Sequence, residues 1–219
     1  NPSLVGSEMC IRDRDDNVRS YREFYDNTLR LLKSKDLDAF DISKENGATR
    51  EKFGLNKFGQ GCLLARRLVE TGVRFVEVAT DGWDMHNNLE SEMEDLSPPL
   101  DQAYSALIAD LEARGLLDET LVVLATEFGR KPQYSGNGRG HYPICYSSVL
   151  AGGGVKRGYV YGSSDQDGAL PNDPVTVPDL HATIGWAAGL PLQEKFQASS
   201  GRPFLVGGDK AKPVMDLFA

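Results

Sequence analysis

The predicted fold depends on two apolar stretches, VRFVEVA (73–79) and LVVLAT (121–126). The first alternates and is rich in β-branched residues, which is typical of a strand. The second is short and continuously apolar, as expected of a strand that helices cover on both faces. Between them, residues 99–114 carry apolar side chains at steps of three and four, which predicts a helix. Together these segments predict a right-handed βαβ unit, in which both strands end at the same edge of a parallel sheet.

The flanking sequence adds further elements to this unit. Periodic apolar residues predict helices over 18–33 and 59–70, and an apolar run predicts a third strand over 144–151. Thr176 and Asp179 have the spacing of a capping box, which predicts a helix that continues to about residue 188. We therefore expect an α/β fold, with a mostly parallel sheet and helices on both of its faces.

The composition fits a globular protein and excludes several classes of partner. The chain has 219 residues, of which 40% are hydrophobic, and this is enough for a sizeable core. Its 24 basic and 32 acidic side chains give a formal net charge of -8, which repels nucleic-acid phosphates and anionic membranes. No stretch approaches the roughly 20 consecutive apolar residues that span a bilayer. We expect no nucleic-acid partner and no membrane span.

The first 14 residues, NPSLVGSEMCIRDR (1–14), resemble a translated sequencing-adapter tail, of the kind found in reading frames from assembled environmental DNA. They have no periodic apolar pattern, so we interpret them as a non-native tail, with an ordinary frayed terminus as the alternative. Residues 15–219 then form part of a single domain. The three cysteines lack the short spacings of a zinc knuckle or a redox pair, which argues against a disulfide framework.

Three polar clusters follow the predicted strands: GWDMHNN (82–88), TEFGRKP (126–132) and GNGRGHYP (136–143). In the first cluster, Asp84 and His86 are two residues apart and point the same way if the segment is extended. Carboxylate oxygen and imidazole nitrogen are ligands that zinc accepts. The alternative is that Asp84 caps the helix that follows and that His86 is a solvated loop residue.

Charged residues of the other two clusters extend this prediction. Glu127 follows a buried strand directly, so its carboxylate needs either a metal or a basic partner, and a salt bridge with Arg130 is the alternative. His141 lies in a glycine-rich loop that can fold over a site. Arg130 and Arg139 are suited to bind a phosphate or sulfate group, and the alternative is that both are solvated surface arginines. His181 lies in no such cluster, and we expect a structural role for it.

Several ordered motifs resemble one known family. They are GQGCLLARRLVETGVRFVEV, GWDMHNN, LVVLATEFGR, GRGHYP, LAGGGVKRG and DLHATI, and they cover about residues 45 to 190. In this order they are similar to the C-terminal half of the domain of unknown function 1501 family, whose members resemble alkaline phosphatases and sulfatases in fold. The resemblance implies an alkaline-phosphatase-like domain that is truncated upstream.

The resemblance also implies a set of metal ligands, namely Asp84, His86, Glu127 and His141. The family usually has Asp before the histidine of the last motif, whereas this chain has Gly140. If that carboxylate orients the histidine, its absence lowers metal affinity, since outer-shell partners contribute roughly 10- to 100-fold. The nucleophile of the superfamily would lie upstream, so no residue of this chain inherits that role.

From these observations we expect a metal-dependent hydrolase of small-molecule or glycan phosphate or sulfate esters. The divalent metal is expected to be zinc, with manganese or calcium as alternatives, and Arg130 and Arg139 are expected to bind the anion. We expect the chain to be inactive alone, because the nucleophile is expected upstream of Asp15. The resemblance further implies a periplasmic or extracytoplasmic location. The alternative is a non-catalytic binding or surface protein, for which Gly140 is the best indication.

Overall fold

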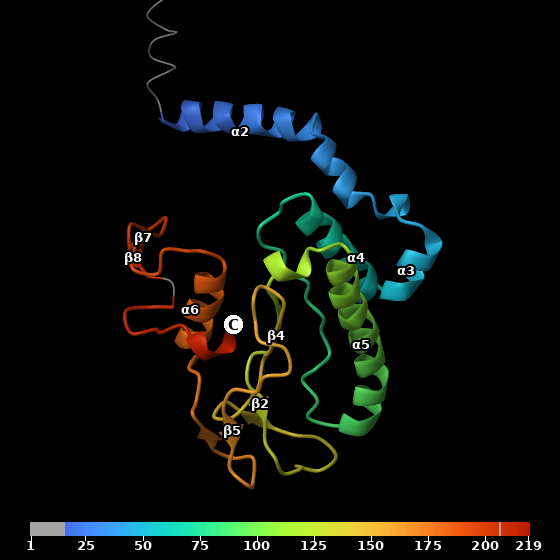
Figure 1. Cartoon of the computed structure of the whole chain (residues 1–219), viewed down its shortest axis with the longest axis vertical. Helices are drawn as coiled ribbons and strands as arrows, with labels where there is room; N and C mark the ends of the chain where they lie inside the picture. The colour runs from blue at the N-terminus through green and yellow to red at the C-terminus, as the bar shows by residue number, and fades with distance from the viewer. Residues whose placement is uncertain (1–15, 206) are drawn as a thin grey trace, which may run out of the picture.

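The computed structural model describes residues 16–205 and 207–219 (Figure 1). The predicted tail at residues 1–14 therefore lies outside the described residues. Helices dominate the first half of the chain: α2 (Asp16–Leu32), η1 (Lys35–Phe40), η2 (Ile42–Lys44), α3 (Gly47–Phe53), α4 (Lys57–Glu70), α5 (Leu89–Ala113) and η3 (Leu117–Glu119).

The second half consists mainly of loops that form short antiparallel pairs. Its elements are β1 (Val122–Leu124), β2 (Gly129–Arg130), β3 (His141–Tyr142), β4 (Val149–Ala151), β5 (Ser163–Ser164), β6 (Pro171–Asn172), α6 (Val177–Ala187), β7 (Phe196–Gln197), β8 (Pro203–Phe204) and η4 (Met215–Leu217). β1 pairs with β4, β2 with β3, β5 with β6, and β7 with β8, and every pair is antiparallel.

The hydrophobic core lies where α3, α4 and α5 pack together (Figure 1). The stripes predicted on residues 59–70 and 99–114 supply it, so both interpretations are confirmed. Its buried residues are Phe53, Cys62, Leu63, Ala103, Ala106, Leu107, Leu111 and Leu117. Burial of these residues stabilises the packing of the helices by about 25 cal/mol for each Å² of apolar surface removed from water.

A charged network joins the same helices to the segment before them. The Arg66 side chain is only 1% exposed, and its guanidinium lies 2.8 Å from Glu45, 2.7 Å from Glu70 and 2.8 Å from Asp110. Arg114 contacts Glu70 and Asp110 as well, at 2.7 and 3.0 Å. An arginine buried this deeply is tolerated because three carboxylates surround it.

The predicted parallel sheet was wrong. Residues 73–79 form no strand, and β1 pairs with β4 in an antiparallel manner, with Val123 opposite Leu150. The predicted third strand over 144–151 is reduced to the three residues of β4. The described chain is therefore mainly helical, with two-stranded ladders in place of an alkaline-phosphatase-like sheet.

Segment 73–79 shows why the sequence pattern led to a wrong prediction of a strand. Its alternation is present in the structure, since Val76 and Val78 are half-buried while Phe75 is 76% exposed. However, no backbone hydrogen bond among the described residues involves residues 74–80. Alternation reports which side chains face a core, whereas a strand also needs a partner at hydrogen-bonding distance. The segment instead runs extended beside α4 and α5 (Figure 1), with Val78 packed against the core.

Helix ends show where local signals were sufficient. Thr176 accepts a hydrogen bond from the Asp179 amide, and the Asp179 carboxylate accepts one in return, so the predicted capping box of α6 is confirmed. The predicted helix over 18–33 is confirmed as α2, although its aromatic face, including Tyr21 and Phe24, is exposed. The start predicted at residue 99 was wrong, because α5 begins at Leu89 and includes two prolines.

Among the described helices, none has the length and apolar character needed to cross a membrane.

Candidate metal centre

The loop that carries Asp84 and His86 lies between the extended segment and α5. Met85, between these two residues, is only 5% exposed and anchors the loop in the protein. Its carbonyl oxygen accepts a hydrogen bond of 3.1 Å from the Arg139 amide, and the Leu89 amide donates one of 2.9 Å to Asn137. These bonds fix the loop against residues 137–139, although the two segments are about 50 positions apart in the sequence.

Gly138 allows this close approach. A Cβ atom at this position would lie 2.1 Å from the His86 carbonyl carbon and 2.5 Å from the Asn87 nitrogen. No side chain fits at such distances, so only glycine brings the two backbones together here. At Gly138, the glycine-rich sequence before His141 therefore serves the close approach of two loops.

The β2–β3 ladder places Arg130 and His141 on adjacent strands. Arg130 is directly opposite His141 in the register, and Gly129 is opposite Tyr142. Residues directly opposite each other in an antiparallel pair carry their side chains on the same face, about 4.5–5.5 Å apart at Cβ. The ladder thus directs the guanidinium and the imidazole toward the same loop.

Asp84, His86 and His141 converge on one point. Asp84 Oδ1 lies 2.9 Å from His141 Nε2 and 3.1 Å from His86 Nε2, and the two Nε2 atoms are 3.0 Å apart. The three side chains are about half exposed, at 59%, 47% and 46% for Asp84, His86 and His141. This trio is the one group of three or more potential metal-ligating side chains found among the described residues.

The chemistry of this trio fits a divalent cation. The Nε2 atom of each imidazole faces both Asp84 Oδ1 and the Nε2 atom of the other imidazole. A single proton on one of these nitrogens forms a hydrogen bond in only one of the contacts. A metal ion about 2.0–2.2 Å from each of the three atoms would accept a lone pair from all of them, and a further ligand could bind on its open side. Two imidazoles and one carboxylate match zinc, and they also match other divalent transition metals.

Arg130 places a positive charge next to the carboxylate of the trio. Its Nη1 lies 2.7 Å from Asp84 Oδ1, the same oxygen that both histidines approach, and its Nη2 donates a long bond of 3.4 Å to the Trp83 carbonyl. The hydrogen bond from His141, followed by that from Arg130, lowers the pKa of Asp84 to about 2. Asp84 is therefore a carboxylate at every physiological pH.

The alternatives considered for Asp84 and Glu127 are not what the structure contains. The residue before α5 is Asn88, in the left-handed region at φ 53°, so Asp84 does not cap this helix. Glu127 is exposed and takes part in no ion pair among the described residues, and Arg130 pairs with Asp84 in its place. Glu127 lies outside the group that converges with Asp84.

The remaining candidates lie around the trio or apart from it. Arg139 stacks on Tyr134, with its Cζ 4.9 Å from the ring centroid, and its buried Nε has no hydrogen-bond partner among the described residues. His181 is exposed on α6, outside the trio. Phe128, which no sequence motif had indicated, packs on His141 with ring centroids 4.4 Å apart. Its only signal in the sequence is its place between Glu127 and Gly129.

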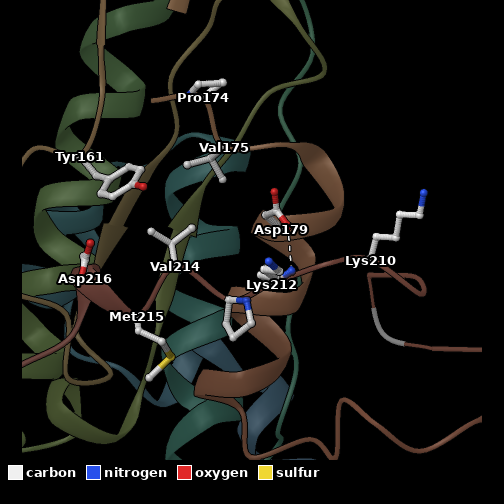
Figure 2. Close-up of a pocket in the computed structure, with 10 residues that line it drawn as sticks. Tyr161, Pro174, Val175, Asp179, Lys210, Lys212, Val214, Met215 and Asp216 are labelled. Carbon is white, nitrogen blue, oxygen red and sulfur yellow. Dashed lines mark hydrogen bonds between the residues drawn. The ribbon is translucent and has the colours of Figure 1, made fainter. Parts of the chain in front are cut away.

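A separate cavity of about 530 Å³ lies beside the N-terminus of α6 (Figure 2). Tyr161, Val175, Val214 and Met215 form its apolar wall, and it shares no residue with the metal-ligating trio. The Asp179 carboxylate in its lining accepts a hydrogen bond of 2.7 Å from the Lys212 amide. Because this carboxylate already neutralises the helix N-terminus, the cavity offers no free anion site there.

The fold and the trio together define a mainly helical protein with an exposed Asp-His-His cluster. A family model described as protein of unknown function (DUF1501) matches residues 4–218, and the chain belongs to this family. The family predicted from the sequence motifs is thus confirmed. No curated protein and no solved structure matches the chain.

Proposed function

We propose that Asp84, His86 and His141 bind a divalent metal, zinc in the first place, in a hydrolase of phosphate or sulfate esters. The observation that carries this proposal is the convergence of one carboxylate oxygen and two imidazole nitrogens within 2.9 to 3.1 Å of one another. Manganese and calcium are less well matched, because they prefer oxygen ligands to imidazole. Glu127 is not included in the proposed ligand set, because it does not converge with the other three.

A bound divalent ion supplies Lewis-acid chemistry, since it withdraws electron density from an oxygen of the ester. The chain contributes the positioning. The loop anchored by Met85 holds Asp84 and His86, and the β2–β3 ladder holds His141 and Arg130. Arg130 and Arg139 offer guanidinium groups to the negatively charged oxygens of phosphate or sulfate. Small-molecule and glycan esters both fit this description, because the trio is open to solvent.

The proposal assigns no nucleophile to this chain, and we propose that the chain alone is inactive. A second candidate function is a non-catalytic binding protein that uses the same metal and arginines to hold an anion. The sequence indication for it is Gly140, which stands where the family resemblance implies an aspartate before His141. Export to the periplasm, which the family resemblance implies, belongs to the same proposal and is tested by cell fractionation.

The test begins with metal uptake by the purified chain. Zinc, manganese and calcium are titrated in turn, and the visible absorption of cobalt bound in place of zinc reports the coordination geometry. One zinc ion bound per chain supports the proposal, and a chain that takes up none of these ions overturns it. Hydrolysis of aryl phosphate and aryl sulfate esters is then measured with the protein extended by its genomic sequence upstream of Asp15. Metal binding without turnover in that protein favours the binding function.

A further inference from the structure

One oxygen of the metal-binding trio is already taken by an arginine. Asp84 Oδ1 lies 2.7 Å from Arg130 Nη1, and this is the shortest of its three side-chain contacts. The guanidinium is permanently charged, so it neutralises the carboxylate whenever the two are in contact. A cation that approaches the trio must therefore compete with Arg130 for the same oxygen.

We propose that Arg130 is exchanged between Asp84 and an anionic ligand, so that metal and anion each strengthen the binding of the other. This inference rests on the proposed function. A divalent ion held by Asp84, His86 and His141 repels the adjacent guanidinium and takes over the charge of Asp84. Arg130 then lacks a counter-ion, and the oxyanion of a phosphate or sulfate group supplies one.

The surroundings of Arg130 allow this exchange. Its side chain is 23% exposed, although Nη1 itself is buried against Asp84. Among the described residues, the side chain makes one further polar contact, the long hydrogen bond of 3.4 Å from Nη2 to the Trp83 carbonyl. A planar guanidinium whose Nη2 is held only by a long hydrogen bond can turn toward a tetrahedral anion and bind two of its oxygens at once. The guanidinium also lies over Phe128, with its Cζ 5.9 Å from the ring centroid. The group is therefore held near the trio while its donors remain available.

Arg139 is the matched comparison within the same site. It lies on the loop that contacts the metal-binding residues, but it has no ion pair with Asp84 and stacks on Tyr134. We expect it to attract an anion by its charge without competing with the metal. Coupling of two binding events is reciprocal, so the exchange at Arg130 must appear in both the metal affinity and the anion affinity.

The experiment is a calorimetric titration of zinc into the chain at pH 7, with and without saturating sulfate, at constant ionic strength. Asp84→Asn identifies the heat that belongs to the trio, and circular dichroism confirms that each variant is folded. In the unaltered chain, sulfate should raise zinc affinity about tenfold, which is within the usual range of coupling, and zinc should raise sulfate affinity equally.

The two arginine variants decide the outcome. Arg130→Gln should bind zinc about fivefold or more tightly than the unaltered chain when sulfate is absent, because the competitor is gone, and sulfate should no longer change this affinity. Arg139→Gln should keep the coupling and lose only sulfate affinity. The inference is overturned if Arg130→Gln keeps the coupling, or if it binds zinc no more tightly than the unaltered chain. Absence of zinc binding in every protein overturns the proposed function as well, whereas uncoupled zinc binding overturns this inference alone.

Discussion

Two arginines of this chain, Arg66 and Arg130, are opposites in their surroundings. Arg66 is 1% exposed, and each of its three nitrogens lies within 2.8 Å of a different acidic residue. Arg130 is 23% exposed and contacts one carboxylate, which two histidines also approach. The first arginine lies between packed helices, and the second lies on a two-residue strand among loops.

The difference shows that the charges around an arginine decide whether it stabilises the fold or stays available for a ligand. Around Arg66, three carboxylates and two further arginines balance in charge, so no group is left to bind a ligand. Around Arg130, one carboxylate oxygen is shared by one guanidinium and two imidazoles, so there are more nitrogen groups than acceptors for them. Saturated networks stabilise a fold, whereas unsaturated and exposed ones are available for a metal or an anion.

The largest effect is expected from removal of the buried arginine. Arg66→Leu should lower the free energy of unfolding by about 3 kcal/mol, because it leaves the partly buried carboxylates of Glu45 and Asp110 without a close, buried partner. Arg130→Leu should lower it by less than about 1 kcal/mol, as is usual for a partly exposed ion pair. Urea unfolding followed by circular dichroism measures both. Equal losses in the two variants would contradict the distinction between the two networks.

The second effect concerns metal affinity alone. Asp84→Asn and His86→Ala should each weaken zinc binding by more than about 100-fold, the upper limit for outer-shell partners. Their free energy of unfolding should change by only about 0.5 kcal/mol, since both residues lie on an exposed loop. Glu127→Gln is the control and should bind zinc normally. If it weakened zinc binding as much as Asp84→Asn, the ligand set would have to include Glu127.

The third effect is a dependence of stability on pH in the helical network. Burial raises the pKa of Glu45, but the hydrogen bonds from Arg67 and Arg66 outweigh it, so the pKa lies below its ordinary value of 4.5. A carboxylate with a lowered pKa in the folded state stabilises the protein above its unfolded pKa, and this stability is lost as the pH falls below about 4.5. Unfolding at pH values from 6 to 3 should reveal the loss, and Glu45→Gln should reduce it. A pH profile identical in the variant would show that other carboxylates are responsible.

The smallest effect is expected at Gly140. A Cβ atom there would lie 3.7 Å from the Lys131 side chain, so Gly140→Asp fits and its carboxylate meets Lys131. Adjacent residues of an extended segment face opposite sides, which places this carboxylate away from His141. We therefore expect zinc affinity to change by less than about tenfold, the lower limit for a residue that orients a ligand. A gain of about 100-fold in calorimetry would mean that the missing carboxylate belongs to the metal centre.

Local signals in the sequence predicted helices well and the sheet badly. The stripe through Cys62 and Leu63 and the capping box of Thr176 depend on residues within one or two turns, and both are present in the structure. The strand predicted over 73–79 depended on a partner far away in the sequence, and that partner is absent among the described residues. Periodicity fixes which face is apolar, but it does not fix pairing.

The sequence by itself determined the helices of the core, the family and the residue types of the candidate site, because these follow from periodicity, capping and ordered motifs. Only the tertiary structure decided which of those residues meet. It brought together Asp84, His86 and His141, left Glu127 exposed, and gave Arg130 to Asp84. The physical reason is that Asp84 and His141 are 57 positions apart, and their distance depends on the backbone contact at Gly138 and on the β2–β3 register. No pattern within a few residues encodes such a contact.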